Sequence, residues 1–215
     1  MVVKEEAVVV LAANWAARAH NGHYRKDGVT PYFAHVARAS ALGAKYGLSV
    51  VARAALLFHD VEEDHPDFDL SEFNAELMVV LEEVYGKDLG TKMYKKFHNI
   101  RKALTKAHSL PEAAGMKSAE RRRYKDIENY GRILKADPEA VACKFCDRID
   151  NMLDSAGVDD DFMHLYIEET ELLISMLMEK AYEYGYVTPV LDLQEAVKET
   201  KKRLGIPMPF DGDTE

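Results

Sequence analysis

The chain has 215 residues, of which 47% are hydrophobic and 30% are charged, and its formal net charge is −9. This length fits one large domain or two small ones, and the low Pro and Gly content is typical of a helix-rich globular protein. The acidic balance argues against duplex nucleic acid as a partner, because that affinity depends largely on Lys and Arg side chains that neutralise phosphates. A small phosphorylated substrate needs only a local basic patch and is compatible with this charge.

Targeting and redox features are sparse. No apolar run approaches the roughly 18 residues of a membrane span. The first 13 residues contain Lys4, Glu5 and Glu6, where a signal peptide needs a clean apolar stretch. We therefore expect a cytoplasmic protein without a membrane partner. Cys143 and Cys146 have no second pair to complete a zinc site, so we interpret them as core residues of a helix.

Hydrophobic residues recur at helical spacing along most of the chain, and no segment alternates as a strand does. Helices are predicted, in chain order, over residues 5–19, 31–46, 49–65, 71–85, 93–105, 118–135, 138–155, 160–184 and 189–204. The segment between the first two contains Gly28 and Pro31 and is expected to be an exposed basic loop. Residues 205–215 are expected to form a loose tail. The predicted fold class is therefore all-α, with one domain over residues 1–204.

Ionisable side chains are concentrated at the end of the third predicted helix, where five of the six residues 59–64 can carry a charge. At about 100° per residue, one helix face carries four of them and Glu62 points elsewhere. These four are His59, Asp60, Glu63 and Asp64. After an apolar run they would repel one another unless a cation or a protein donor lay among them. A solvated helix end is the alternative, although acidic groups there oppose the helix dipole.

A second acidic face lies far along the chain, where Asp147 is followed by Asp150 and Asn151 at helical spacing. A metal site needs such a long-range partner for the adjacent His59-Asp60 pair. A convergent set would offer two imidazoles and two carboxylates, from His35, His59, Asp60 and Asp147. This mixed set of nitrogen and oxygen ligands suits Mn²⁺, Fe²⁺ or Zn²⁺, and the sequence does not select among them.

The order His35, then His59-Asp60, then Asp147 resembles the H…HD…D pattern of the HD-domain metal-dependent phosphohydrolases. Residues 25–35 (RKDGVTPYFAH) and 59–64 (HDVEED) resemble two motifs of the RelA/SpoT-type alarmone hydrolases within that group. Three further landmarks of these hydrolases follow in order: Tyr85-Gly86, residues 103–106 (ALTK) and residues 146–152 (CDRIDNM). Together the motifs span most of residues 10–155, and the resemblance implies an HD-domain helical bundle.

The resemblance implies a stand-alone, manganese-dependent hydrolase that releases pyrophosphate from the 3′ position of (p)ppGpp. Its metal ligands would be His35, His59, Asp60 and Asp147. Glu63 and Asp64 would position the attacking water or relay protons, one as base and the other as acid. Arg25 and Lys26 would neutralise phosphate charge, and Asn151 would contact the nucleotide or orient a ligand.

Several positions depart from the family pattern near the expected nucleotide. Val36 replaces Pro, His65 replaces Thr, Asp150 replaces His, and Leu153-Asp154 replaces a basic residue followed by Thr. These changes favour a second hypothesis, an HD-type hydrolase of dNTPs, nucleoside monophosphates or another phosphate ester. A third hypothesis is a catalytically silent nucleotide sensor, against which the intact Glu63 and Asp64 argue.

Several residues are left outside the predicted site. Asp150 is one of them, because the sequence does not separate a solvated position from one at the site. The remaining histidines are expected at the surface or behind the ligands: His20, His23, His65 and His98. The sequence does not predict an oligomeric state.

Overall fold

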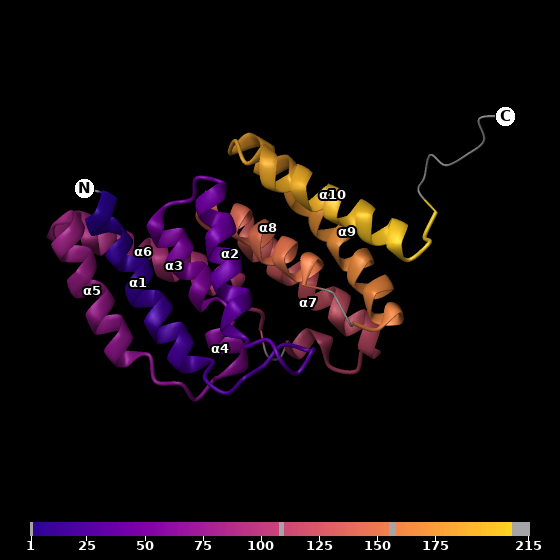
Figure 1. Cartoon of the computed structure of the whole chain (residues 1–215), viewed down its shortest axis with the longest axis horizontal. Coiled ribbons are helices and arrows are strands. Elements are labelled where there is room, and N and C mark those ends of the chain that lie inside the picture. Colours follow the sequence, from indigo (N-terminus) through magenta and orange to yellow (C-terminus); the bar gives the residue numbers. More distant parts are fainter. Residues whose placement is uncertain (1, 108–109, 155–157, 208–215) are drawn as a thin grey trace.

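The computed structural model describes residues 2–107, 110–154 and 158–207, and these ranges are helical without a β-strand (Figure 1). The all-α prediction is confirmed. The elements are α1 (Val2–Ala19), α2 (Phe33–Lys45), α3 (Val50–Phe58), α4 (Val61–Asp64), α5 (Ser71–Tyr85), α6 (Lys87–Leu104), the 3-10 turn η1 (Pro111–Ala113), α7 (Ser118–Ile133), α8 (Pro138–Leu153), α9 (Asp160–Glu183) and α10 (Val187–Arg203).

The helix predicted over residues 49–65 is wrong in one respect, because it is broken at His59 and Asp60 into α3 and α4. The first backbone hydrogen bond of α4 runs from the Asp64 N–H to the Asp60 carbonyl at 2.8 Å. The carbonyl of His59 instead faces the Thr105 hydroxyl at the end of α6, 3.0 Å away. A partner 46 residues away therefore takes the place of the next helical turn.

The helices α5 and α6 form a tight antiparallel hairpin, and α6 begins six residues before the predicted start at residue 93. Gly86 joins them with a positive φ of 79°, which a side chain rarely tolerates. Gly90 then lies so close to α5 that a Cβ atom would come within 2.8 Å of the Leu81 carbonyl oxygen. Both glycines are needed for this close packing.

The helices gather in two groups, with α1, α3, α5 and α6 in one half and α7 to α10 in the other (Figure 1). Between them α2 packs against both α3 and α8. The helices α3 and α8 are the most deeply buried: apart from Val50 and Arg53, every residue of α3 is buried. The centre of the molecule is thus the place where α2, α3 and α8 meet.

Aromatic packing fixes the end of α3 in one half of the molecule. Phe58 stacks on Phe73 of α5 with ring centroids 4.0 Å apart, and both rings contact Phe97 of α6. Each such aromatic pair stabilises a fold by about 0.5–1.5 kcal/mol beyond its area burial. Because Phe58 immediately precedes His59, this cluster also holds the start of the break.

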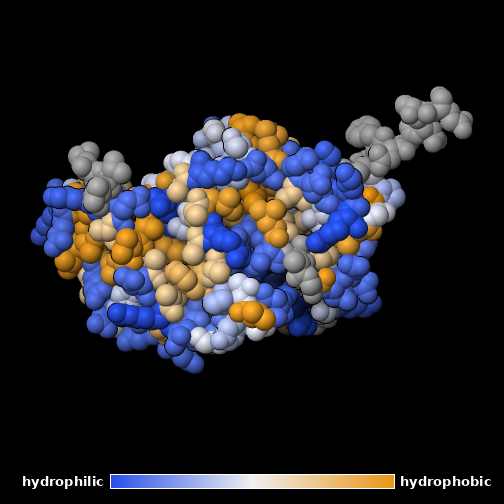
Figure 2. Space-filling view, viewed as in Figure 1, coloured by the Kyte–Doolittle hydropathy of each residue, from blue (hydrophilic) through white to orange (hydrophobic). Residues whose placement is uncertain are grey.

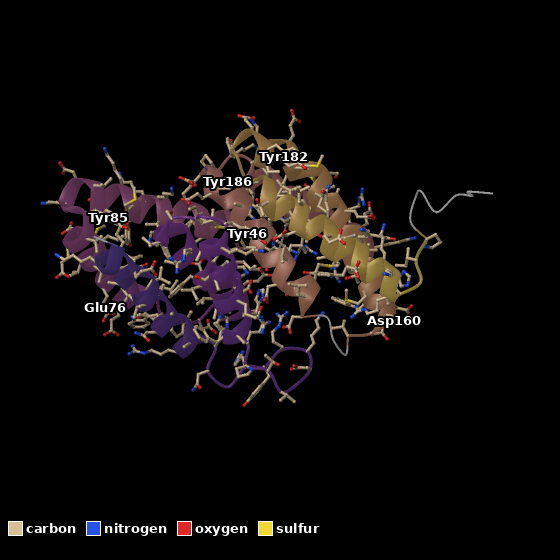
Figure 3. The ribbon with its side chains drawn as sticks, turned by 45° about the horizontal axis from the view of Figure 1, so that its top comes forward. Tyr46, Glu76, Tyr85, Asp160, Tyr182 and Tyr186 are labelled. Carbon is tan, nitrogen blue, oxygen red and sulfur yellow. The ribbon has the colours of Figure 1, made fainter. Side chains whose placement is uncertain are left out.

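Polar contacts join α2 to the other half. The Tyr46 hydroxyl, labelled in Figure 3, and the Lys45 ammonium donate to the Asp192 carboxylate of α10 at 2.6 and 2.7 Å. After α10, the Ile206 N–H donates to the Lys201 carbonyl and its side chain packs against the core. The remainder of the predicted tail, residues 208–215, lies outside the described residues, and the single-domain interpretation stays a prediction.

Among the described residues, no helix is both long enough and apolar enough to span a bilayer. Hydrophobic side chains nevertheless reach the surface in places, as the orange areas of Figure 2 show. Val187 and Leu191 at the start of α10 are the most exposed of those near the α9–α10 turn. The two cysteines of α8 are buried and reduced, in agreement with their interpretation as core residues.

Candidate metal centre

Two imidazoles and one carboxylate converge from three helices at the centre of the molecule. His35 lies in the first turn of α2, His59 directly follows α3, and Asp147 lies within α8. One ligand atom from each lies within 4.8 Å of the other two, and the residues are 1%, 2% and 5% exposed. The Nε2 atoms of His35 and His59 each lie 3.3 Å from Asp147 Oδ1. This trio can hold a metal ion.

Asp60 approaches the same point from the break between α3 and α4. Its Oδ1 lies 3.2 Å from His59 Nε2, and its Oδ2 lies 3.5 Å from His35 Nε2. The Tyr32 hydroxyl donates to Oδ2 at 2.8 Å and thereby fixes the carboxylate. The fold thus brings together the four residues predicted as metal ligands, and their role as ligands stays a prediction.

The orientation of His59 tests the fit of a cation. Its Nδ1 lies 2.6 Å from the Leu56 carbonyl, which can only accept, so Nδ1 carries the proton. Its Nε2 is buried and makes no hydrogen bond with any residue that the structure describes, although two carboxylate oxygens lie 3.2 and 3.3 Å away. This nitrogen is directed at the space between Asp60 and Asp147 and not at either carboxylate alone. Two imidazoles and two carboxylates around that space suit a divalent transition metal.

The positive and negative side chains of the site shift one another's pKa values. Burial alone would lower the pKa of His35, but hydrogen bonds to three carboxylates outweigh it and raise this pKa well above its ordinary value. The pKa of His59 is raised by its attraction to Asp60 and Asp147, also against burial. Burial would raise the pKa of Asp60 and of Asp147, yet neighbouring positive charges hold both below their ordinary values. Both imidazoles therefore bind a proton more readily here than a free imidazole does.

Lys144 supports Asp147 and was not singled out from the sequence. It is only 4% exposed, and its ammonium donates to Asp147 Oδ2 at 2.7 Å, whereas the two histidines approach the other oxygen, Oδ1. Its charge is the largest influence that lowers the pKa of Asp147. The available signal was a lysine three residues before Asp147, within the apolar run that contains Cys143 and Phe145.

The predicted acid and base lie on α4, beside the ligands. The backbone N–H of Lys106 donates to Glu63 Oε2 at 3.1 Å, so the segment after α6 positions this carboxylate. Burial and then repulsion by Asp60 raise the pKa of both Glu63 and Asp64. Glu62 pairs instead with Arg101 of α6 at 2.6 Å. Glu63 and Asp64 therefore hold protons more readily than ordinary carboxylates.

Two of the three predicted substrate residues are linked to the metal centre. Asn151 donates from Nδ2 to Asp147 Oδ1 at 2.8 Å, and its Oδ1 accepts from Arg25 Nη2 at 2.7 Å. Lys26 lies elsewhere, with its Nζ 3.2 Å from the centre of the Phe162 ring on α9. Burial and then the charge of Arg122 lower its pKa. Arg25 and Asn151 thus form one unit with Asp147, whereas Lys26 contacts the start of α9.

Residues 12–175 match the family model of the HD domain. The chain belongs to the HD-domain family. As an HD-domain protein with a His-His-Asp cluster, it is a metal-dependent phosphohydrolase.

A solved structure with the same overall fold is that of a metazoan orthologue of SpoT, described as hydrolysing ppGpp and acting in starvation responses. The two chains are 21% identical and superpose with a TM-score of 0.60, over 94% of this chain and 97% of the other. A search of curated proteins gave no match. The resemblance to SpoT-type hydrolases therefore holds at the level of the HD-domain fold.

Asp150, which the sequence did not place, lies beside the candidate ligands of this HD domain. Asp150 is 3% exposed and its Oδ2 lies 2.7 Å from His35 Nδ1. Arg38 donates to both of its carboxylate oxygens, at 2.6 and 3.1 Å. One turn later, Asp154 accepts from Arg38 at 2.7 Å and from Arg25 at 3.0 Å. Both departures from the family pattern therefore contact residues predicted to belong to the site, Asp150 to His35 and Asp154 to Arg25.

Three histidines of unassigned role lie beside Tyr32. His20 is buried, stacks on the Tyr32 ring, and has its Nδ1 3.1 Å from His65 Nε2. His23 contacts the His65 ring. Burial lowers the pKa of His20 to about 4, so this imidazole is neutral at physiological pH. His20 therefore lies behind the candidate ligands and not at the surface, which were the two positions expected for it.

Proposed function

We propose that this HD domain hydrolyses (p)ppGpp and releases pyrophosphate from its 3′ position. The observation that carries the proposal is the link from Asp147 through Asn151 to Arg25, with contacts of 2.8 and 2.7 Å. It connects the metal-capable trio to an arginine of the loop between α1 and α2, whose charge can attract a nucleotide phosphate. The family membership and the fold shared with a ppGpp hydrolase support the same substrate class.

His35, His59, Asp60 and Asp147 would hold the cation, for which we propose Mn²⁺. When bound, a divalent cation polarises a phosphoryl oxygen and lowers the pKa of a coordinated water. The protein contributes the rest of the centre's charge balance. Lys144 and the Leu56 carbonyl fix Asp147 and His59 in place, so that the ligand atoms are preorganised before binding.

Glu63 and Asp64 would handle the protons of the reaction. Burial and the nearby Asp60 carboxylate raise the pKa of each above its ordinary value, which moves them toward the range where a general acid and base work at neutral pH. The hydrogen bond from Lys106 fixes the position of Glu63. One carboxylate would take the proton of the attacking water, and the other would protonate the leaving oxygen.

Arg25 would bind phosphate, because its planar guanidinium can donate two parallel hydrogen bonds to phosphate oxygens. Asn151 holds it toward Asp147. Lys26 would contribute a second positive charge from the side of Phe162, where burial and Arg122 already lower its pKa. A charged group of the substrate would therefore meet a positive charge on either side of the loop.

A second candidate is an HD-type hydrolase of another nucleotide, such as a dNTP or a nucleoside monophosphate. The contact between Arg25 and Asp154 favours it, because a carboxylate at 3.0 Å competes with a phosphate for the same guanidinium. A substrate with fewer charges than ppGpp would experience less repulsion there.

The decisive experiment offers ppGpp, a dNTP panel and nucleoside monophosphates in parallel to the purified protein with Mn²⁺. We expect phosphate or pyrophosphate release from ppGpp and no release by His59→Ala. His164→Ala, which changes an exposed histidine of α9, is the matched control and should retain activity. Turnover of dNTPs alone would replace the first candidate by the second. Binding of ppGpp without any turnover would indicate a nucleotide sensor.

A further inference from the structure

Asp150 makes a contact that the hydrolase pattern does not account for, because it touches a metal-ligating histidine from behind. Its Oδ2 lies 2.7 Å from His35 Nδ1, and the opposite ring nitrogen, Nε2, lies 3.3 and 3.5 Å from Asp147 and Asp60. The two ring nitrogens of His35 thus have separate partners. We propose that Asp150 is a positioning residue, which fixes the tautomer and the ring orientation of His35 for the metal.

The chemistry of the contact supports this role. A carboxylate accepts hydrogen bonds, so the nitrogen that faces it carries the proton and the other nitrogen presents its lone pair to a cation. Carboxylates that bind the outer nitrogen of a metal-ligating histidine increase its basicity and its alignment. His59 obtains the same orientation from the Leu56 carbonyl. The two histidines are therefore fixed by different acceptors, one from the backbone and one from a side chain.

Arg38 makes the Asp150 contact stable in a buried place. Its Nε and Nη2 donate to the two oxygens of Asp150 at 2.6 and 3.1 Å, a two-pronged pairing that sets the plane of the carboxylate. Asp150 is 3% exposed and would be costly to bury without a positive partner. The Arg38 side chain is 42% exposed and reaches Asp154 as well. The Arg38 guanidinium is thus partly hydrated, and it also neutralises the buried charge of Asp150.

Asp154 provides a matched comparison within the same network. It is one turn from Asp150 on α8 and also accepts from Arg38, but it contacts Arg25 where Asp150 contacts His35. A purely structural ion pair between α2 and α8 would make the two carboxylates equivalent. A positioning role predicts that only Asp150 affects the metal.

The test measures Mn²⁺ affinity by calorimetry for the full chain and for Asp150→Ala, Asp150→Asn and Asp154→Asn. By comparison with similar histidine supports, we expect Asp150→Ala to weaken binding about 10–100-fold. Asp150→Asn keeps an acceptor oxygen and should lose less, whereas Asp154→Asn should remain within about twofold. Equal losses for the Asp150 and Asp154 variants, or an Asp150→Ala variant that binds like the wild type, would overturn the proposal.

A second readout does not depend on how well a variant folds. In the wild-type protein loaded with Zn²⁺, ¹⁵N NMR of the histidine rings should show His35 protonated at Nδ1 and coordinated through Nε2. Coordination through Nδ1 would contradict the proposal. The inference rests on the metal centre of the proposed function and not on its substrate. Failure to hydrolyse ppGpp therefore leaves it intact, and failure of the metal measurements leaves the substrate proposal to its own assay.

Discussion

The metal centre and the loop beside it are built in different ways. The side chains that face the proposed cation are held by buried hydrogen bonds. His59 donates to the Leu56 carbonyl, and Lys144 donates to Asp147. Arg25, on the loop, is held by side chains, Asn151 and Asp154, and the second of these is partly exposed. Buried contacts of the first kind resist exchange, whereas a ligand can replace ion pairs near water. The centre is therefore preformed, and the loop is adjustable.

The largest expected effect comes from removing a ligand of the preformed centre. His59→Ala deletes the buried Nε2 that lies near Asp60 and Asp147. It also deletes the Nδ1 hydrogen bond to the Leu56 carbonyl, so circular dichroism must show that the variant folds. We expect phosphohydrolase activity to fall on the order of 10³-fold or more, with Mn²⁺ binding abolished. Calorimetry and a turnover assay check this, with His164→Ala as the control. Retained activity with Mn²⁺ would show that His59 does not bind the cation.

Changing an acid or base should cost less than removing the ligand and should leave metal binding in place. Glu63→Gln keeps the shape of a side chain that accepts from Lys106, but it cannot exchange a proton. We expect kcat to fall about 10²–10³-fold with Mn²⁺ affinity nearly unchanged. Glu62→Gln, which changes the neighbour paired with Arg101, is the control and should retain most of the activity. A kcat of Glu63→Gln near the wild-type value would exclude Glu63 as acid or base.

The charge balance of the centre predicts a pH dependence of metal affinity. The raised pKa of His35 and of His59 means that protons compete with the cation for their ring nitrogens. Mn²⁺ affinity should therefore rise with pH, by up to about tenfold per pH unit for each proton released. Calorimetry in buffers of different ionisation enthalpy should detect the release of about one to two protons. An affinity that is constant between about pH 6 and 8 would contradict this charge balance.

The smallest effect is expected at the adjustable loop. Asp154→Asn removes the charge that competes for Arg25, so KM for a multiply charged nucleotide should fall about two- to fivefold with kcat unchanged. Arg25→Gln should have the opposite effect to Asp154→Asn and raise KM. Steady-state kinetics at several salt concentrations test both. A KM that rises in Asp154→Asn would mean that Asp154 helps to hold Arg25 for the substrate and does not compete with it.

The convergence of the four candidate ligands was predictable from the sequence, because His59 and Asp60 are adjacent and the other two precede and follow in a recognisable order. The helical character of the long segments followed from their hydrophobic periodicity. The break before Val61 was not predictable, since it depends on Thr105 at the end of another helix. Asp150 was missed for a related reason: its partners His35 and Arg38 lie more than 100 residues earlier. Hydrophobic periodicity describes a single helix, whereas these contacts join side chains of two different helices.

Two neighbouring residues, His59 and Asp60, direct donor atoms toward one point, with His59 Nε2 and Asp60 Oδ1 3.2 Å apart. In coordination chemistry such a pair is a chelate: one short backbone segment presents both donors. Most of the conformational entropy of that segment is already lost on folding, since Phe58 is packed in an aromatic cluster and Asp60 starts α4. A cation that binds the first donor therefore meets the second at little further entropic cost.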